Sequence, residues 1–117
     1  IHDFEKDGFL NKSKLPHQEF DLVYCIVVSE HIEHSANAQF MDALSLGKYV
    51  VFTWCEPGYP GYHHVNCQPE EYWIEKMKQY GFEYDSEFTQ KLKEIAKTEG
   101  DYSPHFASTG LFFKKVL

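Results

Sequence analysis

The amino-acid sequence predicts an α/β domain with a largely parallel sheet. Two apolar runs rich in β-branched residues, within FDLVYCIVV and KYVVFTW, are typical of strands that helices cover on both faces. Segments with helical features follow each run, and the alternation continues to TGLFFKKVL at the end of the sequence. Of the 117 residues, 43% are hydrophobic and 17% aromatic, so we expect one domain, spanning 1–117, with an apolar core.

The first half of the sequence is expected to contain two strands joined through a helix. Polar residues over 5–19 predict a loop, and the apolar run Leu22–Val28 predicts the first strand. A helix follows, with Gly47 placed where a helix stops, and residues 48–54 predict the second strand. The apolar face of this helix is formed by Ala36, Phe40, Met41 and Leu44.

The second half begins with a clearly marked helix. Pro69 suits its first position, two glutamates fill its first turn, and Gly81 suits its C-terminal cap. Residues 82–84 predict a short strand, and residues 86–98 predict another helix. The loop GDYSPHFAS then precedes the last strand, in TGLFFKKVL. The apolar face of the helix over 86–98 is expected to comprise Phe88, Leu92, Ile95 and Ala96.

Charge and hydropathy exclude several classes of protein. The formal net charge is -7 and the lysines are scattered among acids, which argues against binding to nucleic acid or to an anionic membrane. No apolar stretch approaches the ~18 residues of a membrane span, and no signal peptide is recognisable. We therefore expect a cytoplasmic protein that binds neither nucleic acid nor a membrane.

The three cysteines favour reduced thiols over a disulfide framework. Cys25, Cys55 and Cys67 are an odd number and contain no CxxC pair. Cys55 follows a strand-like run without an identifiable base, so we interpret it as a buried, inert thiol.

Polar segments follow both predicted strands of the first half. The segment EHIEH follows the first strand, and the loop over 55–68, which contains PGYPGYHHVNC, follows the second. Ligands of open α/β sheets bind beyond the carboxyl ends of the strands. We therefore expect the two segments to meet at one edge of the sheet and to form the functional site.

His64 and Asn66 are the candidate catalytic residues of this loop. An imidazole titrates near neutrality, so His64 can accept a proton from an acceptor group, and Asn66 can orient either the substrate or that imidazole. In the alternative interpretation, His64 and Asn66 cap the following helix and tie the loop down. Neighbouring residues are candidates for binding the substrate: Tyr59, Tyr62 and His63.

A metal site is a further alternative for the same loop. His63, His64 and Cys67, together with His31 or His34, contain the side chains that bind zinc. The spacing HH-x-x-C matches no ordinary zinc module, so we predict no metal here and retain the alternative as one that stoichiometric zinc in the purified protein would support.

Several stretches resemble class I S-adenosylmethionine-dependent methyltransferases. FDLVYCIVVSEHI resembles the fourth-strand motif of that family, and YVVFTWCEPG resembles its fifth strand and the exit from it. PGYPGYHHVNCQPEEYW is similar to a loop-and-helix pattern of one methyltransferase-like subgroup. GFEYD and GLFFKK resemble the sixth and seventh strands, so the resemblance covers nearly the whole sequence but only the C-terminal half of the family's domain.

The resemblance implies a fold, a cofactor and cofactor-side residues. It implies a Rossmann-like half-sheet of about four mostly parallel strands flanked by helices, with the last strand antiparallel and inserted beside the second. The implied reaction is methyl transfer from S-adenosylmethionine to a small or polar acceptor. Asp3 corresponds to an acid near the cofactor's adenine, and Val28, Ser29 and Glu30 to the rim below the cofactor. The sequence departs from the family at Val27, where the family has a glutamate, and it has no GxGxG motif.

In the family's sheet the fourth strand is central, so the strand over 22–28 is expected to need a neighbour. We expect either an N-terminal segment outside this sequence or a second copy in a homodimer to cover its edge. The alternative function is a non-catalytic methyltransferase-like module for binding or assembly, which pairs through that exposed strand.

Overall fold

Four strands form one mixed sheet in the order β1-β2-β4-β3. The computed structural model describes residues 2–16, 19–58, 60–98 and 104–116. Strands β1 and β2 pair in parallel, and β4 runs antiparallel to both β2 and β3. The predicted α/β class and the antiparallel last strand beside the second are confirmed, although the sheet is mixed rather than largely parallel. The strands are β1 (Phe20–Cys25), β2 (Gly47–Thr53), β3 (Phe82–Tyr84) and β4 (Gly110–Lys115).

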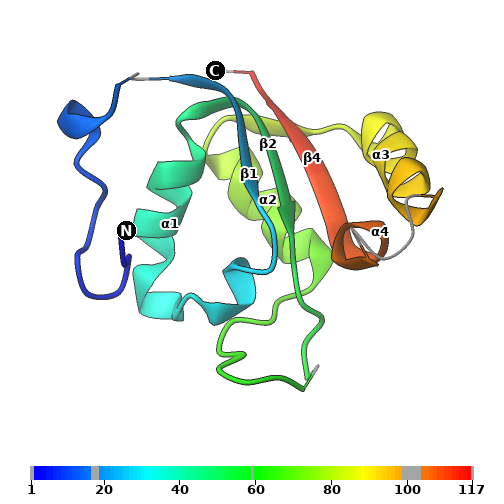
Figure 1. Cartoon of the computed structure of the whole chain (residues 1–117), viewed down its shortest axis with the longest axis horizontal. Coiled ribbons are helices and arrows are strands. Elements are labelled where there is room, and N and C mark those ends of the chain that lie inside the picture. The colour runs from blue at the N-terminus through cyan, green and yellow to red at the C-terminus, as the bar shows by residue number, and fades with distance from the viewer. Residues whose placement is uncertain (1, 17–18, 59, 99–103, 117) are drawn as a thin grey trace.

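Helices flank the sheet and lie close to their predicted positions (Figure 1). The longest, α3, has the predicted bounds, whereas α4 occupies part of the segment predicted to be a loop. The aromatic ring of Phe106 in α4 packs over Gly110, where an added Cβ would lie 2.5 Å from ring carbons. The helices are α1 (Asn37–Leu44), α2 (Glu70–Gln79), α3 (Ser86–Thr98) and α4 (Pro104–Thr109), with 3-10 turns η1 (Lys12–Lys14), η2 (Ser29–His31) and η3 (His34–Ala36).

Helices α1 and α2 lie on one side of the sheet and bury the core against it (Figure 1). The indole ring of Trp73 in α2 is fully buried and meets the edges of Phe52 and Phe40, with ring centroids 5.5 and 6.4 Å away. The helical face predicted for α1 is confirmed by its buried apolar residues. The core comprises Phe40, Met41, Leu44, Val50, Phe52, Trp73, Met77, Phe82, Leu111 and Phe113.

The opposite face of the sheet is covered only in part. Helix α3 packs there through Phe88, whose ring centroid lies 4.6 Å from that of Phe112. In the described chain nothing comparable covers β1, where Leu22 and Tyr24 are 50% and 73% exposed. The prediction that helices cover both faces of this strand is therefore wrong for the described residues. An open groove of about 490 Å³ follows this face, lined by Asp21, Leu22, Tyr49, Asp85, Phe88, Phe112 and Lys114.

The predicted apolar face of α3 is confirmed only in part, at Phe88 and Ala96. Ile95 is 56% exposed and Phe88 is 42% exposed, whereas Thr89 and Ala96 are buried. The hydroxyl of Thr89 accepts a hydrogen bond from the backbone N–H of Phe112 at 3.0 Å. This bond fixes the rotation of α3 and leaves part of its apolar side uncovered.

None of the helices in the described part of the chain has the length and apolar character that a membrane crossing requires.

The thiol of Cys25, at the end of β1, makes the protein less stable as the pH rises in the alkaline range. Burial, and then the charge of Glu30, raise the pKa of its thiol from 9.0 to about 12. Below the unfolded pKa the protonated thiol favours neither state. Between pH 9.0 and about 12 the unfolded chain ionises first, so the free energy of unfolding falls as the pH rises. We expect this thiol to contribute up to about 1.4 kcal/mol per pH unit to that fall.

Urea unfolding of the wild type and of Cys25→Ala at a series of alkaline pH values measures this contribution. Burial also raises the pKa values of Tyr72 and Tyr84, which act in the same direction in both proteins. The difference between the two slopes therefore isolates the thiol. Equal slopes for the two proteins would contradict the prediction.

Candidate functional site

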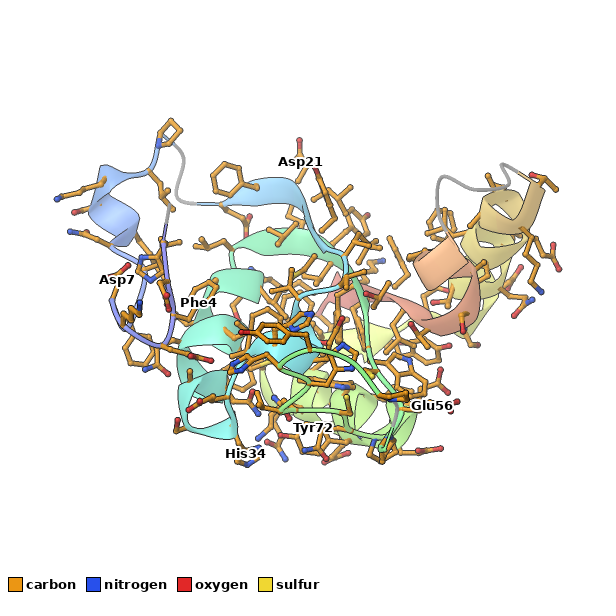
Figure 2. All side chains as sticks on the ribbon, turned by 60° about the horizontal axis from the view of Figure 1, so that its bottom comes forward. Phe4, Asp7, Asp21, His34, Glu56 and Tyr72 are labelled. Carbon is orange, nitrogen blue, oxygen red and sulfur yellow. The ribbon has the colours of Figure 1, made fainter. Side chains whose placement is uncertain are left out.

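The candidate site lies where β1 and β2 end, at the turn η2 and the loop over 54–69. The backbone N–H groups of Val65 and Asn66 both donate to the carbonyl oxygen of Glu30, at 2.9 and 3.1 Å. The two polar segments therefore meet at one edge of the sheet, as predicted. Figure 2 looks onto this loop and shows Glu56 and Tyr72 far from Asp21, which belongs to β1. We call the region formed by η2 and the loop over 54–69 the rim.

The turn after β1 is held by the end of β2. The N–H of Val27 donates to the hydroxyl of Thr53 at 2.8 Å, and the hydroxyl of Ser29 donates to the carbonyl of Thr53 at 2.9 Å. Val27 has a φ of 58°, a left-handed conformation that is strained for a β-branched residue. Such strain persists where surrounding bonds enforce it, and it occurs often at functional sites.

The residues assigned to the cofactor side differ in what they can contact. The side chain of Ser29 is 1% exposed and bonded to the backbone, and Val28 packs against the core. Glu30 is 5% exposed, and among the described residues its carboxylate makes long contacts, to the Ser29 hydroxyl at 3.4 Å and to His31 Nε2 at 3.8 Å. The side chains of Ser29 and Val28 therefore shape the turn after β1, and Glu30 is the acidic side chain of that turn.

Asp3 lies in the N-terminal segment and holds a turn there. Its carboxylate accepts the backbone N–H groups of Glu5 and Lys6, at 2.9 and 3.2 Å. The residue of this segment that reaches the rim is Glu5, whose carboxylate accepts the N–H of Glu33 at 2.9 Å. Figure 2 shows Phe4 and Asp7 of the same segment at one side of the molecule.

Two histidines of the rim face each other, and they are not the adjacent pair. The rings of His31 and His64 meet edge to face with centroids 5.0 Å apart. His31 Nδ1 lies 3.1 Å from the carbonyl oxygen of His63, and because a carbonyl only accepts, this nitrogen is the donor. The exposed side chain of His63 instead lies near Glu5 and Glu33. The structure therefore brings His31 to His64 and places the side chain of His63 elsewhere.

Gly61 makes room for the His64 ring. A Cβ at this position would lie 2.5 Å from His64 Nε2 and 2.6 Å from His64 Nδ1, which is too close for any side chain. His63, two residues later, has a φ of 54°, so the chain reverses sharply there. The glycine and the left-handed turn together turn His64 toward the sheet and His63 away from it.

Asn66 is part of a buried amide network. Its side chain is 1% exposed, donates to Asn37 Oδ1 at 2.8 Å and accepts from Gln68 Nε2 at 3.1 Å. Asn37 in turn donates to the hydroxyl of Tyr72 at 2.9 Å. These bonds support the interpretation that Asn66 ties the loop down. Helix α2 begins after Pro69 without a side-chain cap, so the capping part of that interpretation is wrong.

The candidate substrate-binding tyrosines of the loop are Tyr59 and Tyr62. Tyr62 is 94% exposed, and its ring centroid lies 6.4 Å from that of His63. Tyr59 lies outside the described residues. The side chain of Tyr62 is therefore accessible to solvent.

The loop brings two cysteines to the same histidine. Cys55 is 7% exposed, and its Sγ lies 3.6 Å from His64 Nδ1. Burial, a hydrogen bond that the Cys55 thiol donates to Cys67, and the nearby negative charges of Cys67, Glu30 and Glu56 raise the pKa of the Cys55 thiol to about 12. The prediction of a buried thiol is confirmed, but its neighbours were not foreseen. Its position directly after a strand, at the rim, is the signal that could have placed it in the site.

Ligand-type atoms gather in three groups within the described residues, of which two overlap and the third comprises Glu5, Glu33 and His63. One atom each from Cys55, His64 and Cys67 lies within 4.8 Å of the others. The same holds for Glu30, His31 and His64. His64 belongs to both overlapping groups and is therefore the centre of the rim.

Comparison of the chain with family models, with curated proteins and with solved structures finds no match.

Proposed function

We propose that the chain takes part in cytoplasmic methyl transfer from S-adenosylmethionine to a small or polar acceptor that binds at the rim. The observation that carries the proposal is the strand arrangement. Strand β4 is antiparallel and lies between β2 and β3, as the resemblance to class I methyltransferases implies. The polar rim at the ends of β1 and β2 supports the same reading, because α/β folds bind their ligands there.

The proposed roles follow from the exposure of each side chain. Tyr62 and His63 are exposed and contact the acceptor. His64, which is partly buried, faces the acceptor from within the loop. Most of the rate of a methyl transfer comes from positioning the two reactants in line, and a loop fixed by backbone bonds to Glu30 provides such positioning. Asn66 acts through the loop that it anchors and makes no contact with the acceptor.

The cofactor side of the proposed site requires a second unit beside β1. This strand lies at an edge of the described sheet, and its exposed face carries Leu22 and Tyr24. An apolar edge strand is a template for pairing with another strand. We propose that an upstream segment of the protein, or a second copy, pairs with β1 and supplies the phosphate- and ribose-side contacts of the cofactor.

The same exposed strand favours the alternative, a non-catalytic module that assembles through β1. A methylation assay separates the two. Protein carrying any upstream residues of its gene is incubated with methyl-labelled S-adenosylmethionine and a panel of small thiols, amines and alcohols. The proposal predicts transfer of label to one class of acceptor, with a rate that Tyr62→Ala lowers. A stable assembly without label transfer to any acceptor would favour the module instead.

A further inference from the structure

Cys55 and His64 stand at the separation that a shared metal ion imposes on its ligands. With zinc–sulfur and zinc–nitrogen bonds of about 2.3 and about 2.0 to 2.1 Å at a tetrahedral angle, the two ligand atoms lie about 3.6 Å apart. The observed distance from Cys55 Sγ to His64 Nδ1 is 3.6 Å. Cys67 places its sulfur within 4.8 Å of the Cys55 sulfur and of a ring nitrogen of His64. The three side chains thus need only small movements to surround one ion.

The segments that carry these side chains are fixed independently of any metal. Cys55 lies two residues after the end of β2 and is buried, and Asn66, next to Cys67, is bonded to Glu30 and Asn37. Gly61 leaves the space that the His64 ring occupies. A cluster held in this way loses little conformational entropy when an ion binds, which favours high affinity.

The charges around the cluster also favour a cation. Glu30 is almost fully buried, and its ion-pair contact among the described residues is a long one, 3.8 Å to His31 Nε2. A buried carboxylate is costly without a counter-charge. Its carboxylate shares a group with His31 and His64, so it lies within reach of a fourth coordination position or of the ligand shell.

The geometry points to a site for a zinc-class divalent cation on Cys55, His64 and Cys67, with Glu30 beside the fourth position. Two sulfurs and one imidazole nitrogen are a donor set that selects zinc over magnesium or calcium. Binding replaces the two thiol protons, which leave to solvent, so neither oxidation nor reduction takes place.

This site does not depend on methyl transfer. With its Nδ1 lone pair on the metal, His64 is a ligand and no longer a proton acceptor. A metal with three protein ligands and an adjacent carboxylate retains a position that a water molecule or a substrate atom can take. The metal therefore either ties the loop to β2 or serves the reaction at the rim, and its presence is measurable without any assay of activity.

The test is metal binding by the reduced, metal-free protein. Zinc affinity is measured by competition with a chromophoric chelator, and bound metal is counted by mass spectrometry. Cobalt(II) is added in parallel, because tetrahedral thiolate complexes of this ion have two sets of bands. These are d–d bands in the visible and thiolate-to-cobalt charge-transfer bands in the near ultraviolet. We expect one ion per chain and both sets of cobalt bands.

Variants identify the ligands. Loss of an outer-shell partner typically costs 10- to 100-fold in metal affinity, so Cys55→Ser, Cys67→Ser and His64→Ala are each expected to lose more than about 100-fold. Glu30→Gln is expected to lose about 10- to 100-fold. Cys25→Ser is the matched thiol control and His63→Ala the matched histidine control, and both should bind zinc as the wild type does. Circular dichroism of each variant distinguishes loss of a ligand from loss of the fold.

Two results would overturn the proposal. The first is a reduced wild type that binds no zinc, or a cobalt complex without thiolate charge-transfer bands. In that case mass spectrometry under oxidising conditions asks whether Cys55 and Cys67 form a disulfide instead. The second is an equal loss of affinity in Cys25→Ser and Cys55→Ser, which would place the metal elsewhere.

Discussion

Replacing Trp73 with alanine is expected to lower the free energy of unfolding by about 3–5 kcal/mol. The indole ring is fully buried between α1 and the sheet, where it meets Phe40, Phe52 and Tyr72 edge to face. Domains of this size have a total stability of about 5–15 kcal/mol, so the variant should be close to unfolded at 37 °C. Urea unfolding followed by circular dichroism measures the change.

Two further variants make this prediction specific. Trp73→Phe retains an aromatic ring and removes an indole N–H that has no hydrogen-bond partner in the described structure, so it should cost clearly less than the alanine variant. Tyr62→Ala removes a side chain that is 94% exposed and should change stability by no more than about 0.5 kcal/mol. A Trp73→Ala protein as stable as Tyr62→Ala would mean that the core is packed differently.

Replacing Gly61 with alanine is expected to reduce the zinc affinity of the chain by at least about 10-fold, on the scale of outer-shell losses. The new Cβ would occupy the position of the His64 ring, and this side chain must move because the loop backbone is bonded to Glu30. Stability should change little, since residue 61 is exposed. Chelator competition measures the affinity, and nuclear magnetic resonance of the imidazole nitrogens shows the displacement.

The matched control is Pro60→Ala, a neighbouring exposed position whose substitution leaves the space around His64 unchanged. A double variant sharpens the result: in a His64→Ala background, Gly61→Ala should have no further effect on metal binding. Wild-type zinc affinity in Gly61→Ala would show that the His64 ring does not need this space.

The elements of the fold were predictable where local pattern alone determines them. Strand β3 and helix α3 have the predicted bounds, because Gly81 and the change of periodicity after it mark them in the sequence. Strand β1 begins two residues earlier than the predicted run and ends at Cys25, since Val27 turns the chain away. Helix α4 was missed because it depends on the packing of Phe106 over Gly110, which is a tertiary contact.

The exposure of β1 could not be predicted from its composition. An apolar run indicates that a strand is suited to burial, but it does not identify the element that covers it. Leu22 and Tyr24 satisfy the pattern of a strand buried on both faces, yet both are exposed in the described structure. The described residues provide no element over this face of β1, and the composition of the strand alone does not predict that.

The meeting of two polar segments at the rim followed from a general rule, whereas the pairing of their side chains did not. The rule for carboxyl ends of strands placed Glu30 and the loop together, which the bonds from Val65 and Asn66 confirm. The contact of His64 with His31 and Cys55 depends on the space above Gly61 and on the left-handed turn at His63. Neither feature is visible as a motif, so the sequence did not predict these side-chain contacts.

The most direct test of the proposed function is calorimetric titration with S-adenosylhomocysteine, the product form of the cofactor. Two preparations are titrated: the 117-residue chain at a concentration that permits self-association, and the chain with any upstream residues of its gene. The proposal predicts micromolar binding by whichever preparation covers β1, with a stoichiometry of one per site. No detectable heat from either preparation would contradict it, and β1 would then be studied as an assembly surface.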